Sequence, residues 1–114
     1  MIASSLRIGN LIGKVTDESL DTVVVTTDIL KKIQSGEHDF IEIPLSDYWL
    51  DVLGFKFNES FLWWYKYTGF TDVCMCIDVR KDVSYSSNYS YDWYPITSVH
   101  QLQNLYHSLT GKEL

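Results

Sequence analysis

The middle of the chain contains two apolar runs separated by a short polar break. Residues 61–79 read FLWWYKYTGFTDVCMCIDV, with TGFTD between the two runs. Alternation along a strand groups every second residue of the first run on one face, namely Phe61, Trp63, Tyr65 and Tyr67. The opposite face then carries Leu62, Trp64 and Lys66. This pattern predicts two antiparallel strands with a tight connection, and we expect them to form the centre of the fold.

Shorter strand patterns precede this hairpin. Residues 6–15 are apolar but interrupted by glycines, which is typical of a bent strand. A polar segment at 16–21 follows, and residues 22–27, TVVVTT, form the purest β-branched run of the chain. Together these segments resemble the opening of a small SH3-like barrel. Residues 40–43, FIEI, alternate as a short strand does.

One segment in the first half of the chain carries clear helix start and stop signals. Residues 46–53 begin at Ser46, a favoured N-cap residue, and precede Gly54, which suits the left-handed position after a helix. Residues 28–36, DILKKIQSG, are ambiguous. Asp28 is the candidate cap if they form a short helical turn.

Residues 98–109 show the strongest helical pattern. Ser98 and Gln101 have the spacing of a capping box. One face is apolar and comprises Val99, Leu102, Leu105, Tyr106 and Leu109. The other face is polar and comprises His100, Gln101, Gln103, Asn104, His107 and Ser108. We therefore expect the three leucines to be buried against the sheet and the polar face to lie in solvent.

These elements predict one domain over residues 1–114 with an α+β fold. The expected architecture is a bent, mostly antiparallel sheet, with an SH3-like barrel in its N-terminal part and two short helices at 46–53 and 98–109. A length of 114 residues fits a single domain, and a hydrophobic fraction of 46% is enough for a packed core.

Charge and cysteine usage narrow the classes of function. A net charge of −6 disfavours nonspecific nucleic-acid binding, which needs a basic surface. Cys74 and Cys76 would lie about 7 Å apart on one strand, beyond disulfide range, so we expect free thiols in a reducing compartment. The N-terminal residues lack a signal-peptide pattern, and no run reaches the about 18 apolar residues of a membrane span. The sequence thus predicts a cytoplasmic protein without membrane association.

Motifs of enzyme chemistry are absent from the sequence. It contains no nucleophile elbow, zinc-protease motif, P-loop or Rossmann glycine pattern. His100 and His107 are two helical turns apart, or about 10 Å, which is too far for them to share a metal ion. We therefore predict a non-enzymatic protein with no catalytic residue, no metal site and no cofactor.

Three blocks of sequence carry a resemblance to a known group of proteins. They are LRIGNLI at 6–12, IPLSDYWLDVLGF at 43–55 and VHQLQNLYHSLTGKEL at 99–114. In this order and spacing they resemble a family of small uncharacterised proteins from Bacteroidetes genomes and their phages. The resemblance brings no activity and no site residues. It implies the product of a phage or mobile-element gene that works in the host cell cytoplasm.

Aromatic residues exceed what a small core usually needs. They make up 15% of the chain, and residues 80–92, RKDVSYSSNYSYD, add a tyrosine- and serine-rich segment typical of recognition loops. Aromatic rings beside a basic side chain are also suited to stacking a nucleotide. The candidate ligand-binding residues are Trp63, Tyr65, Tyr67, Arg80, Tyr85, Tyr89, Tyr91 and Trp93. The alternative is that these rings pack in the core or along a sheet edge.

The favoured hypothesis is a non-enzymatic phage binding protein that counteracts host defence. It would sequester a small nucleotide signal or cover a host defence protein. One alternative is a homo-oligomeric structural or virion-associated protein, in which Trp63, Tyr65 and the segment 85–91 lie between subunits. Another is a small SH3-like nucleic-acid adaptor, which the acidic charge disfavours.

Overall fold

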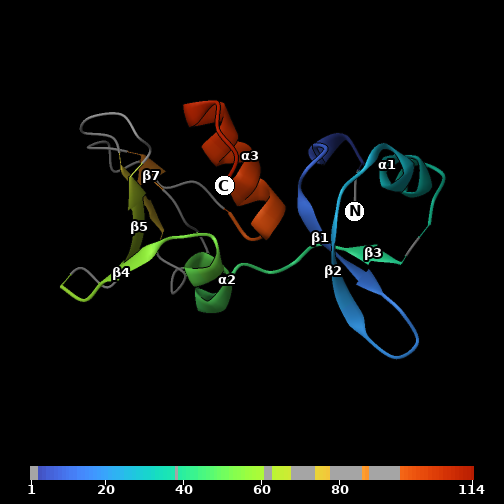
Figure 1. The fold of residues 1–114 in the computed structure, drawn as a ribbon, viewed down its shortest axis with the longest axis horizontal. Helices are drawn as coiled ribbons and strands as arrows, with labels where there is room; N and C mark the ends of the chain where they lie inside the picture. The colour runs from blue at the N-terminus through green and yellow to red at the C-terminus, as the bar shows by residue number, and fades with distance from the viewer. Residues whose placement is uncertain (1–2, 38, 61–62, 68–73, 78–85, 88–95) are drawn as a thin grey trace. The chain divides into compact units, whose positions relative to one another are not determined.

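The computed structural model describes residues 3–37, 39–60, 63–67, 74–77, 86–87 and 96–114 (Figure 1). Two compact units can be distinguished. Unit 1 comprises Met1–Pro44 and Ser98–Asn104, and unit 2 comprises Leu45–Thr97 and Leu105–Leu114. Helices and antiparallel sheets occur together, so the α+β class is confirmed. The single domain over residues 1–114 stays a prediction.

Unit 1 is built on a three-stranded antiparallel sheet in the order β2-β1-β3. Its strands are β1 (Leu11–Val15), β2 (Leu20–Val24) and β3 (Phe40–Ile41). Gly13 of β1 lies opposite both Thr22 of β2 and Ile41 of β3. These described strands form an open sheet, so the expected SH3-like barrel is not formed among them. A helix follows β2 where a barrel would need a further strand.

The helix α1 (Thr27–Gln34) packs on one face of this sheet, beside the short 3-10 helix η1 (Ala3–Ser5). Its N-cap is Thr26, whose Oγ1 accepts a hydrogen bond from the Ile29 N–H at 3.3 Å. The cap considered at Asp28 is therefore wrong by two residues, and Asp28 lies in the first turn, where its charge favours the helix dipole. The buried core between helix and sheet comprises Ile12, Val25, Ile33 and Phe40.

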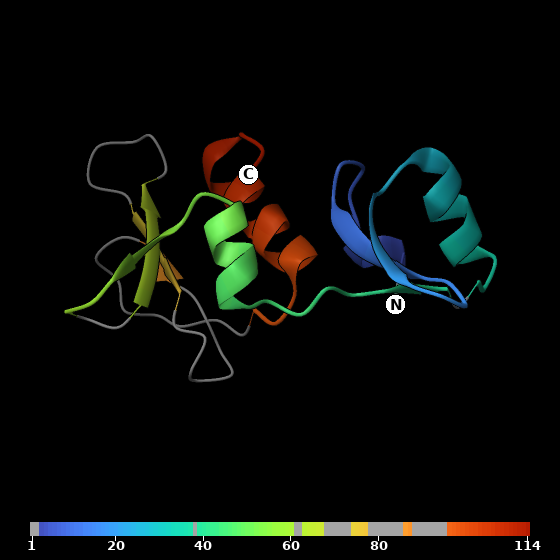
Figure 2. The same ribbon diagram turned by 60° about the horizontal axis from the view of Figure 1, so that its bottom comes forward.

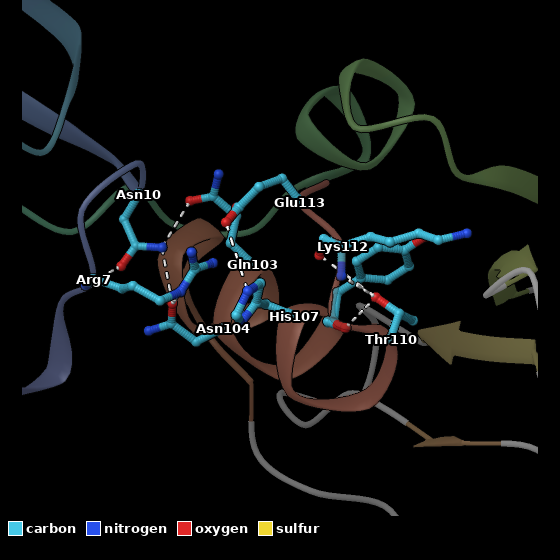
Figure 3. Close-up of polar contacts among 9 residues, drawn as sticks. Arg7, Asn10, Gln103, Asn104, His107, Thr110, Lys112 and Glu113 are labelled. Carbon is cyan, nitrogen blue, oxygen red and sulfur yellow. Dashed lines mark hydrogen bonds and ion pairs between the residues drawn. The ribbon is translucent and has the colours of Figure 1, made fainter.

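A buried amide cluster joins the start of β1 to the last helix within unit 1 (Figure 3). Asn10 is fully buried, and its Nδ2 donates to Gln103 Oε1 at 3.4 Å and to Asn104 Oδ1 at 2.8 Å. Its own oxygen accepts from the Arg7 N–H. Gln103 Oε1 also accepts from the Leu11 N–H at 2.8 Å. These side-chain amides thus provide hydrogen-bond partners for buried polar groups that water does not reach.

Unit 2 contains a four-stranded antiparallel sheet in the order β4-β5-β6-β7. Its strands are β4 (Lys56–Asn58), β5 (Trp63–Tyr67), β6 (Cys74–Ile77) and β7 (Ser86–Ser87). Trp64 lies opposite Ile77 and Tyr65 opposite Cys76, so the predicted pairing of the two central runs is confirmed. Ile77 is fully buried.

The helix α2 (Asp47–Val52) precedes this sheet (Figure 2). It begins as predicted, with Ser46 Oγ accepting from the Trp49 N–H at 3.4 Å. Gly54 follows the helix with a φ of +90°, a left-handed conformation that glycine adopts without strain. A hydrogen bond of 2.9 Å from Trp64 Nε1 to Asp47 Oδ1 links β5 to the first turn of α2.

The last helix, α3 (Val99–Thr110), has the predicted capping box at its start. Ser98 Oγ accepts from the Gln101 N–H at 3.4 Å, and Gln101 Oε1 accepts from the Ser98 N–H at 3.3 Å. The expectation that its polar face lies in solvent is wrong for His100 and Gln103, which are 1% and 3% exposed. This part of the helix belongs to unit 1, where Ile43 O accepts from the Val99 N–H at 2.9 Å and Gln103 Oε1 accepts from the Leu11 N–H.

The apolar face of α3 is buried only in part. Leu102 is fully buried as expected, whereas Leu109 in the last turn is 42% exposed, so its predicted burial is wrong. Leu105 is half-buried. Among the described residues, no helix has the length and apolar character needed to cross a bilayer.

Replacing Asn10 by alanine tests the amide cluster. The Asn10→Ala chain should lose about 2–3 kcal/mol of unfolding free energy, because Gln103 and Asn104 lose a buried donor and the Arg7 N–H loses this acceptor. Urea unfolding followed by circular dichroism measures this loss. Gln34→Ala, on an exposed position of α1, is the control. Equal stability of the two variants would contradict the role given to Asn10.

Candidate functional site

A small cavity lies in unit 2 at the corner where α2 ends and β4 begins. It has a volume of about 230 Å³ and is lined by Gly54, Lys56, Tyr65, Lys66 and Tyr67. Three of these residues, Tyr65, Lys66 and Tyr67, belong to the central strand β5, the aromatic-rich run of the sequence. Two lysines and two tyrosines therefore line one space.

The tyrosines form the aromatic wall of the cavity. Tyr65 and Tyr67 project from the same face of β5, and their ring centroids are 5.8 Å apart with the planes at 76°. This edge-to-face contact holds the two rings against each other. Tyr67 is nevertheless 70% exposed, which leaves ring surface free for a ligand. Lys56 lies directly opposite Tyr65 in the sheet register, so its side chain starts from the same face.

Lys66 reaches the cavity from the other face of β5 and is held by the end of α2. Its Nζ donates to the Leu53 carbonyl at 3.1 Å, and Leu53 is the C-cap residue of that helix. Carbonyls at a helix end lack partners within the helix, and a lysine is a favourable donor to them. The ammonium group also lies 5.9 Å from the ring centroid of Tyr106, within cation–π range.

Gly54 leaves the space that this lysine occupies. A Cβ atom added to Gly54 would lie 2.6 Å from Lys66 Nζ. The same residue needs its left-handed φ of +90° to end α2. One glycine therefore serves both the turn and the position of the ammonium group.

This arrangement is suited to binding an anion that carries a flat ring. Two ammonium groups provide donors for a phosphate or carboxylate, and an exposed tyrosine face provides a stacking surface. The volume is below the roughly 300–1,000 Å³ of cavities that enclose a whole drug-sized ligand. The cavity therefore accommodates one group of a ligand and leaves the remainder at the surface. Among the described residues no three His, Cys, Asp or Glu side chains are grouped to hold a metal ion.

Only some of the candidate ligand-binding residues named from the sequence line the cavity. Tyr65 and Tyr67 line the cavity. Trp63 is half-buried at the start of β5, opposite Asn58, and is not among the lining residues. Five further candidates lie outside the described residues, namely Arg80, Tyr85, Tyr89, Tyr91 and Trp93. The side chains of Cys74 and Cys76 also lie outside them.

Sequence reasoning missed Lys56, Lys66 and the spatial role of Gly54. A usable signal existed for Lys66, because it is the one charged residue within the run FLWWYKY. Its contact with Leu53 depends on the path of the chain between the two residues, which local patterns do not specify.

A second group with unusual surroundings is His100, in unit 1. Its Nδ1 lies 3.2 Å from Ser98 Oγ, and its Nε2 is buried without a hydrogen-bond partner in the described part of the chain. Burial lowers the pKa of His100 below 6.5, against a smaller upward effect of the Glu42 carboxylate. The neutral imidazole is therefore the form that suits the folded chain. Ser98 is fully buried and caps α3, so the pair has no access for a substrate.

No protein-family model, curated protein or solved structure matches this chain. The resemblance to small proteins of Bacteroidetes and their phages therefore stays a prediction.

Two glycine substitutions test the contact between Gly54 and Lys66. Gly54→Ala should lower the unfolding free energy more than Gly36→Ala does. Gly36 has a nearly equal φ of +94°, but a Cβ atom there would meet no heavy atom within 4 Å. Both variants carry the same backbone strain, of about 1 kcal/mol. Only Gly54→Ala also displaces the lysine, so the difference in urea midpoint measures that contact.

A double-mutant cycle completes this test. In a Lys66→Met background the extra loss caused by Gly54→Ala should shrink, because no ammonium group remains to be displaced. An unchanged loss in that background would show that Lys66 does not occupy the position described.

The pKa of His100 predicts how stability depends on pH. Below about pH 6.5 the unfolded chain binds a proton at His100 that the folded chain binds less readily, so the unfolding free energy falls as the pH falls. His100→Gln should reduce this fall between about pH 6.5 and pH 5. His107→Gln, at a residue whose side chain is 41% exposed, is the control. Identical pH profiles for the wild-type and His100→Gln chains would contradict the prediction.

Proposed function

We propose that this chain is a non-enzymatic binding protein that binds a small nucleotide at the cavity lined by Gly54, Lys56, Tyr65, Lys66 and Tyr67. The phosphate lies between the ammonium groups of Lys56 and Lys66, and the base stacks on Tyr67. The observation that carries this proposal is the meeting of two lysines and two tyrosines around one space of about 230 Å³.

The two lysines have different parts in this proposal. Lys66 is fixed by the Leu53 carbonyl, which uses one of its three N–H donors, so little side-chain entropy is lost when a phosphate binds it. Lys56 is exposed at the start of β4 and can move toward the ligand. The fixed ammonium group of Lys66 sets the position of the phosphate. The mobile side chain of Lys56 adjusts to the size of the ligand.

The small volume limits the ligand class. The cavity is large enough for a phosphate or for part of a base, and a nucleotide with one phosphate and one base spans from the lysines to the exposed ring of Tyr67. Because the chain carries a net charge of −6, it does not attract polyanions in general. This balance favours a small nucleotide over a long nucleic acid.

The biological setting is supported by the sequence resemblance alone. The three blocks at 6–12, 43–55 and 99–114 resemble recurring pieces of small uncharacterised proteins from Bacteroidetes genomes and their phages. We infer from this a counter-defence protein that removes a nucleotide signal from the host cytoplasm. Capture of a host defence protein and assembly into a homo-oligomer stay alternatives to this setting.

Calorimetry with three probes tests the proposed ligand class. AMP should bind more tightly than either adenosine or inorganic phosphate, because only AMP contacts both the lysines and Tyr67. Tyr67→Ala should weaken AMP binding by about tenfold, the usual effect of losing one stacking ring. Lys56→Gln should weaken binding of AMP and of phosphate alike, and more strongly at low salt.

Lys32→Gln is the matched control, since Lys32 is exposed on α1 in unit 1. Its affinity for AMP should equal that of the wild-type chain. Absence of AMP binding by a folded chain would sink the proposal. Equal losses for Lys32→Gln and Lys56→Gln would show that net charge, and not the cavity, governs binding.

A further inference from the structure

The strand β2 forms an open edge of the unit 1 sheet. The sheet order β2-β1-β3 leaves only one side of β2 paired among the described strands. The Val25 N–H donates to Asn10 O, and the Thr16 N–H donates to Ser19 O. The backbone groups of Ser19 and Val25, at the two ends of β2, therefore face β1. Because antiparallel pairing uses alternate residues, the backbone groups of Leu20, Thr22 and Val24 point to the outer edge.

The side chains of the same residues lie on an uncovered face of the sheet. Leu20 is 62% exposed and Val24 is 53% exposed. On the same face the register places Val15, 43% exposed, opposite Leu20, and Ile41, 38% exposed, opposite Gly13. Leu20 Cδ1 and Ile41 Cγ1 occupy the space above Gly13, each 3.1 Å from where a Cβ atom would lie, so these two side chains lie close together over β1. Charged residues of the hairpin, such as Lys14 and Asp21, alternate onto the opposite face.

This edge has few of the features that usually protect an exposed strand, Asp21 being its one charged residue. β2 reads LDTVV, with no proline and no lysine, and it pairs with β1 over five consecutive residues without a bulge. Its outward backbone groups and apolar side chains are those that a partner strand uses in strand addition. The partner must supply apolar residues at alternate positions.

Charge indicates which kind of strand is accepted. The turn before β2 carries Asp17 and Glu18, and residues 1–44 hold seven carboxylates against four lysine or arginine side chains. A second copy of this chain would bring the same acidic surface to the edge, and like charges oppose that pairing. A segment with basic residues between its apolar ones would instead be attracted.

We propose that the β2 edge binds an extended segment of a partner protein in which apolar and basic residues alternate. The segment adds a fourth strand to the unit 1 sheet beside β2. Its apolar side chains cover Leu20 and Val24, and its basic side chains lie near the carboxylates of the hairpin. This surface belongs to unit 1 and does not depend on the nucleotide cavity of unit 2.

A synthetic peptide tests the proposal on the full chain. A capped peptide of about seven residues with alternating valine and lysine should bind, and the same peptide with glutamate for lysine should not. Fluorescence anisotropy of the labelled peptides measures both. Binding should weaken as salt is raised, because part of the attraction is electrostatic.

Two substitutions test whether the peptide binds at the β2 edge. Thr22→Pro removes an outward N–H that β1 does not use, so the sheet tolerates it while strand addition is weakened by about tenfold. Val24→Lys places an ammonium group on the apolar patch and should weaken binding of the valine–lysine peptide by about tenfold, because the valines of the peptide would have to cover that charge. Val52→Lys is the matched control, because Val52 of α2 is also 53% exposed, and it should leave both affinities unchanged.

Three results would overturn the proposal. They are absence of binding of the valine–lysine peptide, binding that survives both Thr22→Pro and Val24→Lys, and equal weakening by Val52→Lys and Val24→Lys. Light scattering adds a further outcome. A dimer of the chain that Thr22→Pro abolishes would assign the edge to a second copy, against the basic segment proposed here.

Discussion

The hydrogen bonds of the buried Asn10 amide are the constraint on which unit 1 depends most. Water does not reach this side chain, so its donors and acceptor must be satisfied by Gln103, Asn104 and the Arg7 backbone. These groups are satisfied only when the start of β1 and the beginning of α3 are together. The sheet, its helix α1 and the first turns of α3 are thereby fixed as one arrangement, in which His100 is also enclosed.

The elements that local chemistry specifies could be predicted from the sequence. Ser46, Ser98 and Gln101 cap helices as their side chains suggest, and the alternation in residues 63–67 gives the faces of β5. Elements that depend on long-range packing could not be predicted. Polar spacing placed His100 and Gln103 in solvent, but both are buried within unit 1, where Gln103 bonds to the Leu11 backbone more than ninety residues earlier.

The cavity likewise has one part that local sequence predicts and one part that depends on long-range packing. Strand alternation brought Tyr65 and Tyr67 to one face, which is a property of consecutive residues alone. The place of Lys66 depends on a carbonyl thirteen residues earlier, at the end of another element, and on the missing side chain of Gly54. The lining of the cavity thus combines a predictable aromatic strand with a basic group positioned by chain topology.

The separation of Asn10 from Gln103 and Asn104 also bears on how the chain folds during synthesis. Residues 45–97, which supply the strands of unit 2, are made between the two halves of the amide cluster. The strands of unit 1 are therefore translated first but wait for the beginning of α3 before their buried amides are paired. Contacts of such high sequence separation slow folding, because a long loop must close before they form. We expect nascent chains that end before residue 98 to hold the β1–β2 hairpin in an incomplete, easily digested state.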